Sequence, residues 1–369
     1  MKVDGKDIRP IWFDSSEGVV KIIDQRVLPY ELKIVALKNV DEIIKAIKEM
    51  YVRGAPLIGV TGAYGAFLAA CNLGEENIND ESLINECKRI KDSRPTAINL
   101  PWAVDRVCSQ ILKGKTAAER IEIAKIEAEK IADFEVDNCK RIGEHGLSLL
   151  EKISLNKKGS TVNILTHCNA GWLACIEYGT ATAPMYAAYD KGIDIHVWVD
   201  ETRPLNQGAR LTAWELSKYG VKNTIIPDNT GGHLMQHGMV DIVIVGSDRT
   251  TYTGDVANKI GTYLKALAAH DNNIPFYVAL PSTSFDWTIR NGLSDIPIEK
   301  RNPDEVRYIK GFHNGKVEDI LITNQSYNAL NFAFDVTPSR LVTGFITERG
   351  VCNANEESLK FMFPENTKN

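Results

Sequence analysis

From residue 160 onward the chain alternates between short, apolar, β-branched runs and segments with helical spacing. The apolar runs predict strands at Val162–Thr166, Ile193–Val199, Thr224–Ile226, Asp241–Val245, Phe276–Leu280 and Leu341–Ile346. The helical patterns between them include Gly171–Tyr189, Ala209–Tyr219 and Ala257–His270. Buried strands separated by helices are typical of a parallel α/β sheet with right-handed crossovers. This part of the chain is therefore predicted to form a doubly wound, mostly parallel sheet.

The first part of the chain predicts a smaller α+β domain. Three short runs, Ile11–Phe13, Val19–Asp24 and Leu32–Ala36, predict a small antiparallel sheet. Helical patterns follow at Val40–Tyr51, Glu75–Lys91, Asn99–Leu112 and Thr116–Leu150, and the uncharged run Gly54–Gly74 predicts a further helix with its entry loop. A boundary within the last long helix gives an N-terminal domain at residues 1–125 and a catalytic domain at residues 126–369.

Composition and charge argue against nucleic-acid binding, a membrane span and secretion. The net charge of -5 and the pI near 5.9 offer no basic patch for nucleic acid. The run Gly54–Gly74 is long enough for a membrane span, but its proline and glycines favour a buried helix. The N-terminus lacks the apolar stretch of a secretory signal. Seven cysteines without a C-x-x-C pair favour free thiols in a reducing cytoplasm.

A polar cluster directly follows five of the predicted strands. The clusters are His167-Cys168-Asn169, Asp200-Glu201-Thr202-Arg203, Pro227-Asp228-Asn229, Ser247-Asp248-Arg249 and Pro281-Ser282-Thr283. Turns need Asn, Asp and Ser for their own geometry, but a thiol, a carboxylate and an arginine at one edge favour an active site. Ligands of open α/β sheets bind outside the carboxyl ends of the strands.

Cys168 and Asp248 are the two candidates for chemistry at this edge. Cys168 stands between a predicted strand and a helix expected to begin near Ala170-Gly171. A helix N-terminus would lower the pKa of the thiol, although a cysteine can also be a small buried hydrophobe. Asp248 can act as a general acid or base if burial raises its pKa, and the alternative is a structural turn or N-cap aspartate.

Several polar residues could hold an anion. Arg53 and Arg94 lie in loops beside glycine and proline, and Gln207-Gly208 and Asn258-Lys259 are each expected at a helix start. Arginine offers forked donors, lysine a point charge, and a helix N-terminus adds its dipole. Together they predict a phosphate site.

Other cofactor signals are weak or missing. His233 and His237 would share a helix face, but no third ligand accompanies them, so we expect no metal there. No G-x-G-x-x-G follows the first strand of the sheet, and no P-loop occurs in the chain, which disfavours nicotinamide and nucleoside triphosphate roles.

At these residues the chain resembles the methylthioribose-1-phosphate isomerase family, the aldose–ketose isomerases of methionine salvage. The matching segments are RGAPLIG (Arg53–Gly59), RPTAINLPWA (Arg94–Ala103), LTHCNAG (Leu165–Gly171), DETRPLNQGARLTAWEL (Asp200–Leu216), GDVANKIGTY (Gly254–Tyr263) and IPIEKRNPDEV (Ile296–Val306). Two stretches depart from the sequence that is usual in the family: GSDRTTYTGDVANK around Asp248, and DNTGGHLMQHG.

The resemblance implies an isomerase that acts on a small sugar phosphate. Cys168 and Asp248 would be the catalytic pair, and the substrate would be bound by Arg53, Gly54, Ala55, Arg94, Gln207, Asn258 and Lys259. It also implies a small N-terminal domain, a Rossmann-like C-terminal domain, and a homodimer that acts without metal or nucleotide. Taken with the composition, this predicts a cytoplasmic enzyme that needs no cofactor and binds no nucleic acid or membrane.

Three alternatives stay open. A sister isomerase would act on 5-deoxyribose 1-phosphate or ribose 1,5-bisphosphate. The regulatory subunits of the translation initiation exchange factor are also related to this family and are not isomerases, but the presence of Cys168, Asp248 and the phosphate anchors favours an enzyme. A dinucleotide-dependent dehydrogenase would also have such a sheet, but this chain lacks the glycine fingerprint of that class of enzyme.

Overall fold

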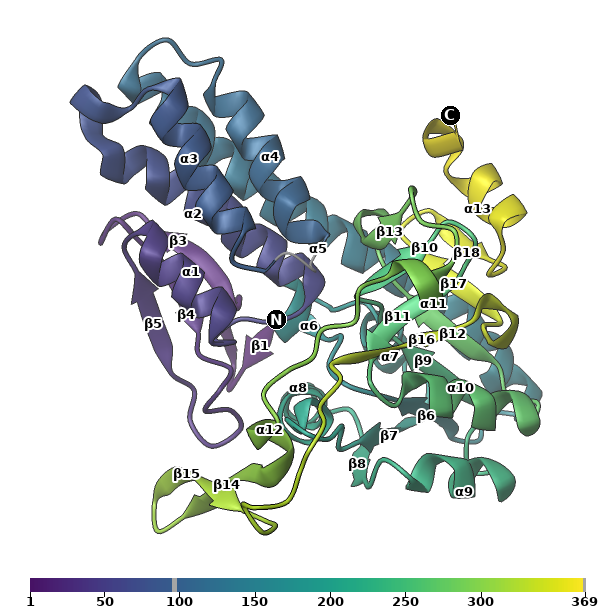
Figure 1. Ribbon diagram of the computed structural model, residues 1–369. Coiled ribbons are helices and arrows are strands. Elements are labelled where there is room, and N and C mark those ends of the chain that lie inside the picture. The colour runs from purple at the N-terminus through teal and green to yellow at the C-terminus, as the bar shows by residue number, and fades with distance from the viewer. Residues whose placement is uncertain (95–97, 368–369) are drawn as a thin grey trace.

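The computed structural model describes residues 1–94 and 98–367, so Pro95–Ala97 of the matching segment at Arg94 lie outside the described residues. The chain forms an N-terminal part with a small sheet and a group of long helices, and a C-terminal part built on a larger sheet (Figure 1). The small sheet has the antiparallel order β3 (Ile11–Asp14), β4 (Val19–Ile23), β5 (Ile34–Leu37), as predicted. A short hairpin, β1 (Lys2–Val3) and β2 (Lys6–Asp7), precedes it.

The N-terminal helices pack around α2. They are α1 (Val40–Lys48), α2 (Ala55–Asn77), α3 (Asp80–Lys91), α4 (Asn99–Ile111) and α5 (Ala117–Asn156). Small residues on α2 let its neighbours approach: a Cβ on Gly62 would lie 2.5 Å from Leu100 Cδ1. Ala55–Gly74 has the length and hydropathy of a membrane span, but 78% of it is buried inside the protein. The run is a core helix, as the sequence predicts.

Helix α5 spans both parts of the chain. Thr116 and Glu119 form a capping box at its start. Near that end Ala128 belongs to the N-terminal core, and farther along Ile142 belongs to the core beneath the large sheet. The predicted domain boundary after residue 125 falls inside this helix, and its position stays a prediction.

The large sheet has the order β18-β17-β12-β9-β6-β7-β8. Its strands are β6 (Val162–Thr166), β7 (Ile195–Asp200), β8 (Asn223–Ile226), β9 (Ile242–Val245), β12 (Phe276–Ala279), β17 (Gly344–Thr347) and β18 (Gly350–Cys352). All neighbours pair in parallel except β17 and β18. The six predicted strands are confirmed with shifts of a few residues at their ends.

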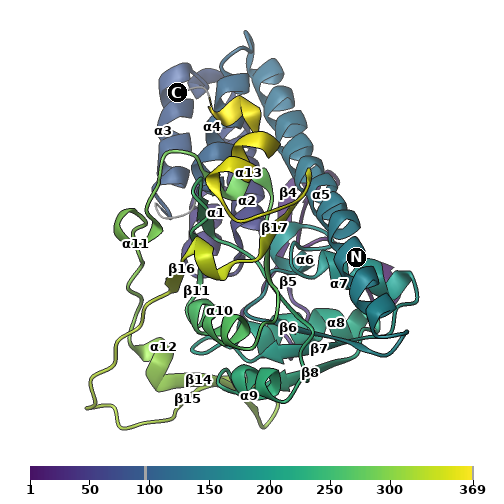
Figure 2. The same ribbon diagram turned by 90° about the vertical axis from the view of Figure 1, so that its right-hand side faces the viewer.

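Helices cover both faces of this sheet (Figure 2). On one face α7 (Ala183–Asp190), α8 (Ala213–Tyr219) and the C-terminal half of α5 pack on strand residues such as Ile164 and Ile244. On the other face α9 (Thr230–Gln236), α10 (Thr262–Asp271) and α13 (Glu356–Met362) pack on Leu165 and Val243. Successive strand residues alternate between two apolar cores, as a doubly wound sheet requires.

The chain reverses its direction across the sheet between β6 and β9. From β6 it proceeds outward to β7 and β8, and from β9 it proceeds the other way to β12 and β17. In doubly wound sheets the loops at such a switch point diverge and leave a crevice at the carboxyl ends of the strands. Cys168 follows β6 and Asp248 follows β9, so both lie at this crevice.

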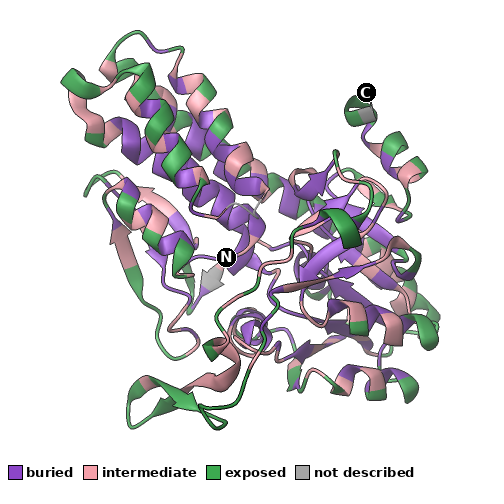
Figure 3. Ribbon diagram, in the orientation of Figure 1, coloured by how far each residue is buried: buried purple, intermediate pink, exposed green. Residues whose placement is uncertain are grey.

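A second, four-stranded sheet lies beyond the switch point, in the order β13 (Phe285–Asp286), β10 (Arg249–Thr251), β11 (Val256–Lys259), β16 (Phe334–Thr337). The exposed hairpin of β14 (Tyr308–His313) and β15 (Lys316–Leu321) extends from the molecule (Figure 3). Short helices complete the fold: α6 (Trp172–Cys175), the π-helix η1 (Gly208–Thr212), α11 (Gly292–Asp295), α12 (Asp304–Arg307), and the 3-10 turns η2 (Ser282–Ser284), η3 (Ser339–Leu341) and η4 (Pro364–Thr367).

Three predicted helices differ from the structure. The segment Gly171–Tyr189 is not one helix, because Ile176 adopts φ +80 and separates α6 from α7. The pattern Ala257–His270 begins with a strand, because β11 pairs with β10 and with β16 far along the chain. The polar stretch Glu75–Lys91 divides into the end of α2 and the separate helix α3, which Asn79 caps.

Candidate active site

The crevice at the switch point is a narrow cavity of about 50 Å³. Every residue predicted for the site lines it: Arg53, Gly54, Ala55, Arg94, Cys168, Gln207, Asp248, Asn258 and Lys259. They come from the start of α2, the loop before α4, the ends of β6 and β9, the residue before η1, and β11. The structure thus brings together residues that are spread over more than 200 positions of the sequence, and their roles stay predictions.

Cys168 is held by its backbone. Its φ is +66, in the left-handed region that is uncommon for a residue with a side chain. Its N–H donates to Thr202 Oγ1 at 2.8 Å, and its carbonyl accepts from Thr212 Oγ1 at 2.6 Å. Burial raises the pKa of the thiol, although the positive charges of Arg53 and Lys259 oppose this. The predicted lowering of the pKa by a helix N-terminus is wrong, because α6 has only four residues and begins at Trp172.

Asp248 stands just before β10 and is half-buried. Its N–H donates to the Ala257 carbonyl at 3.1 Å, which ties it to the strand that carries Lys259. Burial raises the pKa of its carboxyl, and the charges of Lys259, Arg94 and Arg53 oppose the rise. A carboxyl in this state can exchange a proton with a bound sugar at a pH closer to neutrality than an exposed aspartate can.

Arg53 is oriented by a residue that we did not predict for the site. Its Nη1 donates to Asn169 Oδ1 at 2.7 Å, and its Nη2 donates to the Asn169 carbonyl at 2.5 Å. Asn169 Nδ2 donates in turn to Glu215 Oε1 at 3.0 Å, and the Glu215 carboxyl also accepts from the backbone N–H groups of Trp172 and Leu173. The sequence places Asn169 in a polar cluster that follows a strand, which is a signal for a site residue. For Glu215 the only signal is its place in a segment that matches the family.

Asn258 and Lys259 lie on β11 and not at a helix start, so the expected help from a helix dipole is wrong for this pair. Lys259 Nζ lies 4.8 Å from the centre of the Phe334 ring, on the neighbouring strand β16. Burial lowers the pKa of Lys259, while the nearby Cys168 and Asp248 raise it. The lysine is therefore a poorly hydrated cation that faces the cavity.

Two further polar groups are available to a ligand. Arg94 lies 3.8 Å from Glu299 as a loose ion pair. Among the described residues, Gln207 Oε1 is buried and has no hydrogen-bond partner, so it can accept a hydrogen bond from a ligand. Gly54 brings the chain into α2 with φ +95, and a Cβ there would come within 2.5 Å of Ala174 Cβ.

The apolar walls of the cavity are built from small or flat side chains and not from a large core aromatic. Trp172 packs in the core beneath the large sheet and does not line the cavity. The apolar walls come instead from small or flat side chains, namely Ala55, Ala174, Pro281 and Phe334. The arginines at the strand ends do not line it either: Arg203 donates to the Val306 carbonyl, and Arg249 pairs with Asp286.

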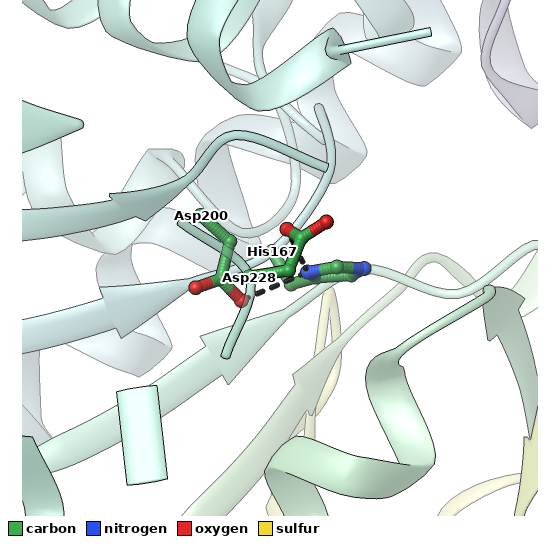
Figure 4. Close-up of side chains that lie close together, drawn as sticks. All are labelled: His167, Asp200 and Asp228. Atoms are coloured by element: carbon green, nitrogen blue, oxygen red, sulfur yellow. Dashed lines mark hydrogen bonds and ion pairs between the residues drawn. The ribbon is translucent and has the colours of Figure 1, made fainter. Parts of the chain in front are cut away.

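Three residues at the edge of the cavity offer atoms of the kind that bind metals: His167, which lines the cavity, and Asp200 and Asp228 behind it (Figure 4). Each of these groups already has a protein partner. His167 Nε2 lies 2.8 Å from the Ile260 carbonyl, the Asp228 carboxyl accepts from two backbone N–H groups, and Lys265 Nζ lies 3.2 Å from Asp200 Oδ2. A lysine ammonium thus supplies the positive charge that such a cluster needs.

The other histidine pair lies elsewhere. The rings of His233 and His237 are 4.2 Å apart at the end of α9, and no third metal-type ligand accompanies them within residues 1–94 and 98–367.

Comparison with known proteins decides the family. A model of the initiation factor 2 subunit family matches residues 51–354. The chain is 62% identical over 363 residues to the methylthioribose-1-phosphate isomerase of Desulfosudis oleivorans, with 98% of each chain covered. It is 60% identical to that of Desulfatibacillum aliphaticivorans, with 100% of each chain covered. The chain belongs to the methylthioribose-1-phosphate isomerase family.

Solved structures agree with this family. The 5-methylthioribose 1-phosphate isomerase of Pyrococcus horikoshii superimposes with a TM-score of 0.83 at 37% identity, covering 98% of this chain and 97% of that one. A structure described as translation initiation factor eIF-2B, subunit delta, from A. fulgidus gives a TM-score of 0.80 at 38% identity, covering 97% and 100%. The predicted methylthioribose-1-phosphate isomerase family and the predicted α/β fold are both confirmed.

Proposed function

We propose that this protein is an aldose–ketose isomerase that converts 5-methylthioribose 1-phosphate to 5-methylthioribulose 1-phosphate in L-methionine salvage. The observation that carries the proposal is the pairing of Cys168 and Asp248 in one cavity with the cations of Arg53, Arg94 and Lys259. The names and the full-length similarity of its relatives support the same substrate.

The cations account for recognition of the phosphate. Arg53 presents a guanidinium fixed by Asn169, and Lys259 adds a poorly hydrated ammonium. The backbone at Gly54 and Ala55, where α2 begins, offers N–H groups that the helix itself leaves unpaired. A dianion held this way would place C1 of the sugar beside the two proposed catalytic residues.

The chemistry is constrained by the substrate. In a sugar 1-phosphate the anomeric oxygen is esterified, so the ring cannot open to a free aldehyde. The bond between C1 and the ring oxygen must break with assistance, and a hydrogen must move from C2 to C1. We assign proton exchange with the sugar to Asp248, whose pKa is raised by burial, and stabilisation of the transition state to Cys168. The low-polarity walls strengthen both interactions.

A branch of the cavity supports the methylthio substituent over a second phosphate. This branch, of about 30 Å³, shares Ala55, Arg94, Asp248 and Phe334 with the main cavity, and Ile58, Ala257, Ile296 and Pro297 form much of the rest of its wall. The two arginines that line it, Arg94 and Arg249, already face the carboxyls of Glu299 and Asp286. Burying a phosphate dianion against such a wall would cost more free energy than burying a thioether. The branch therefore favours an apolar group at C5.

The decisive experiment offers the purified protein three sugar 1-phosphates and follows ketose formation by NMR. The substrates are 5-methylthioribose 1-phosphate, 5-deoxyribose 1-phosphate and ribose 1,5-bisphosphate. We expect the highest kcat/KM with the first. Higher kcat/KM with either of the others would move the assignment to a sister isomerase. No turnover of any of them would overturn the isomerase and favour a non-catalytic role as a subunit of a translation initiation factor.

Variants test the assigned roles. Cys168→Ala and Asp248→Asn should each lower kcat by about a hundredfold or more, while Cys352→Ala, at a cysteine away from the cavity, should not. Near-normal kcat in either of the first two would remove that residue from the mechanism. Arg94→Ala should chiefly raise KM.

We further propose that the protein acts as a homodimer in the cytoplasm. Exposed apolar side chains on the β14–β15 hairpin, such as Phe312 and Leu321, support self-association, and the seven free thiols suit a reducing compartment. Light scattering on the purified chain would test the dimer, and a mass equal to one chain would contradict it.

A further inference from the structure

His167, the residue before Cys168, is buried with hydrogen-bond acceptors on both sides of its ring. Its side chain is 1% exposed. Nδ1 lies 2.9 Å from Asp200 Oδ2, and Nε2 lies 2.8 Å from the Ile260 carbonyl oxygen. A carbonyl oxygen can only accept, so Nε2 must carry a proton and donate it.

The charges around the ring favour a second proton on Nδ1. The groups that face it are the carboxyls of Asp200, Asp228 and Asp335 and the ammonium of Lys265. Lys265 Nζ approaches Asp200 Oδ2 to 3.2 Å, which stabilises that carboxyl as an anion and as an acceptor for Nδ1–H. Burial raises the pKa of the Asp200 and Asp335 carboxyls, and positive charge on His167 and Lys265 opposes the rise. A protonated ring would add a second cation beside these carboxyls.

The ring connects two parts of the site that share no strand pairing. Cys168 follows β6 of the seven-stranded sheet, whereas Ile260 follows Lys259 at the end of β11 in the four-stranded sheet. A glycine makes room for the contact: a Cβ on Gly261 would lie 3.1 Å from the ring's Nε2. The imidazole therefore spans the gap between the backbones that carry the thiol and the ammonium.

We propose that His167 is a positioning residue, doubly protonated, that donates to Asp200 and to the Ile260 carbonyl and so fixes the spacing between Cys168 and Lys259. This inference rests on the proposed isomerase function for its kinetic consequence, but not for the protonation state of the ring. Loss of one of these two hydrogen bonds would let β11 shift relative to β6 and misplace the phosphate relative to the thiol. A misplacement of about 1 Å at an active site can cost about a hundredfold in rate.

The first test is spectroscopic and needs no substrate. Ring nitrogens labelled with 15N in all histidines are observed in long-range 1H–15N correlation spectra at pH 7.5, and His167 is assigned by its absence in His167→Gln. We expect protonated shifts for both of its nitrogens. An unprotonated shift for either nitrogen would overturn the proposal. Asp200→Asn, which removes the anionic acceptor, should convert Nδ1 to the unprotonated form.

The second test is kinetic. Glutamine can keep only one of the two hydrogen bonds, so His167→Gln should lower kcat at least about tenfold. The factor by which kcat falls should be larger than the factor by which KM rises. The matched control is His196→Gln, on neighbouring β7, whose ring contacts Thr224 and Trp198 outside the cavity and whose loss should leave kcat unchanged. A kcat within about threefold of the parent enzyme would also overturn the positioning role.

The two tests separate this inference from the proposed function. If the protein turns over none of the sugar phosphates, the isomerase assignment fails, while the spectra still decide whether the ring carries two protons. If His167→Gln does not fold, the histidine whose Nδ1 signal changes in Asp200→Asn identifies His167 in the spectrum of the parent protein, and the same point is decided.

Discussion

Arg53 and Asn169 are joined by two hydrogen bonds although 116 residues separate them: Nη1 donates to Oδ1 at 2.7 Å, and Nη2 donates to the main-chain carbonyl at 2.5 Å. The first residue enters the long core helix α2, and the second follows the central strand β6. The orientation of a proposed phosphate anchor thus depends on the part of the chain that carries the thiol.

Asn169→Ala should therefore weaken substrate binding. The substitution removes one acceptor of a charged donor, an interaction that typically contributes about 1.5–3 kcal/mol. We expect KM to rise between about tenfold and a hundredfold, with a smaller change in kcat, in steady-state assays. Asn163→Ala, on β6 itself and away from the cavity, is the control. Unchanged KM in Asn169→Ala would show that Arg53 does not depend on this contact.

Phe334→Leu should reduce the affinity for the phosphate group. The ring lies 4.8 Å from Lys259 Nζ, and a cation held over an aromatic face gains about 0.5–2 kcal/mol. We expect KM to rise about twofold to thirtyfold. Phe332→Leu is a matched control, because that ring faces Lys300 at 5.6 Å on the surface, outside the cavity. Equal effects of the two substitutions on KM would contradict the prediction.

Glu135→Gln should stabilise the protein at alkaline pH. Burial raises the pKa of Glu135 to about 7, and its Oε2 has no hydrogen-bond partner among the described residues. Because the folded pKa lies above the unfolded value, the stabilising contribution of the proton is complete below about pH 4.5 and is lost as the pH rises through 7. Glutamine stays neutral and avoids this loss, which amounts to about 3 kcal/mol at most.

The measurement is the Tm of Glu135→Gln and of the parent protein at pH 5 and pH 8. The variant should have the higher Tm at pH 8, and the difference should shrink at pH 5. Glu122→Gln, exposed on the same helix, should show no such dependence. A Tm difference that is the same at both pH values would mean that ionisation of Glu135 is not its cause.

Gly208→Ala should be strongly destabilising. A Cβ at this position would lie 1.8 Å from the Asp200 carbonyl oxygen, which is backbone and cannot turn aside. Overpacking of this kind costs about 1–3 kcal/mol or more, so we expect a clear fall in Tm. Gly232→Ala in α9 is the control: its Cβ would meet nothing closer than 3.7 Å, and alanine favours helix. A higher Tm for Gly208→Ala than for Gly232→Ala would refute the steric argument.

The sequence was informative where local pattern and burial agree. The β-branched runs at the centre of the sheet are buried on both faces, and the edge strand β8 kept the same composition although Thr224 and Ile225 are exposed, so composition marked all six predicted strands. The polar clusters after them met at one edge because parallel strands end on the same side. The family resemblance then added Arg53 and Arg94, which lie in another part of the chain and are brought to the cavity only by tertiary structure.

The sequence was misleading where distant contacts override local preference. Ala257–Lys259 has a helical pattern but forms a strand, because its partners in β16 lie more than 70 residues later. The pKa of Cys168 moves opposite to expectation, because its depth of burial is set by several segments together. Glu215 supports Arg53 only through Asn169, and such a chain of contacts leaves no periodic signal in a sequence.

Helix α5 has a practical consequence for dissecting the molecule. Its first half completes one hydrophobic core through Ala128, and its second half completes another through Ile142. Wherever the chain is cut between the two parts, at least one fragment loses part of its own core and exposes apolar surface. We therefore expect separately expressed halves to aggregate, and to recover solubility only when they are produced together and share the helix.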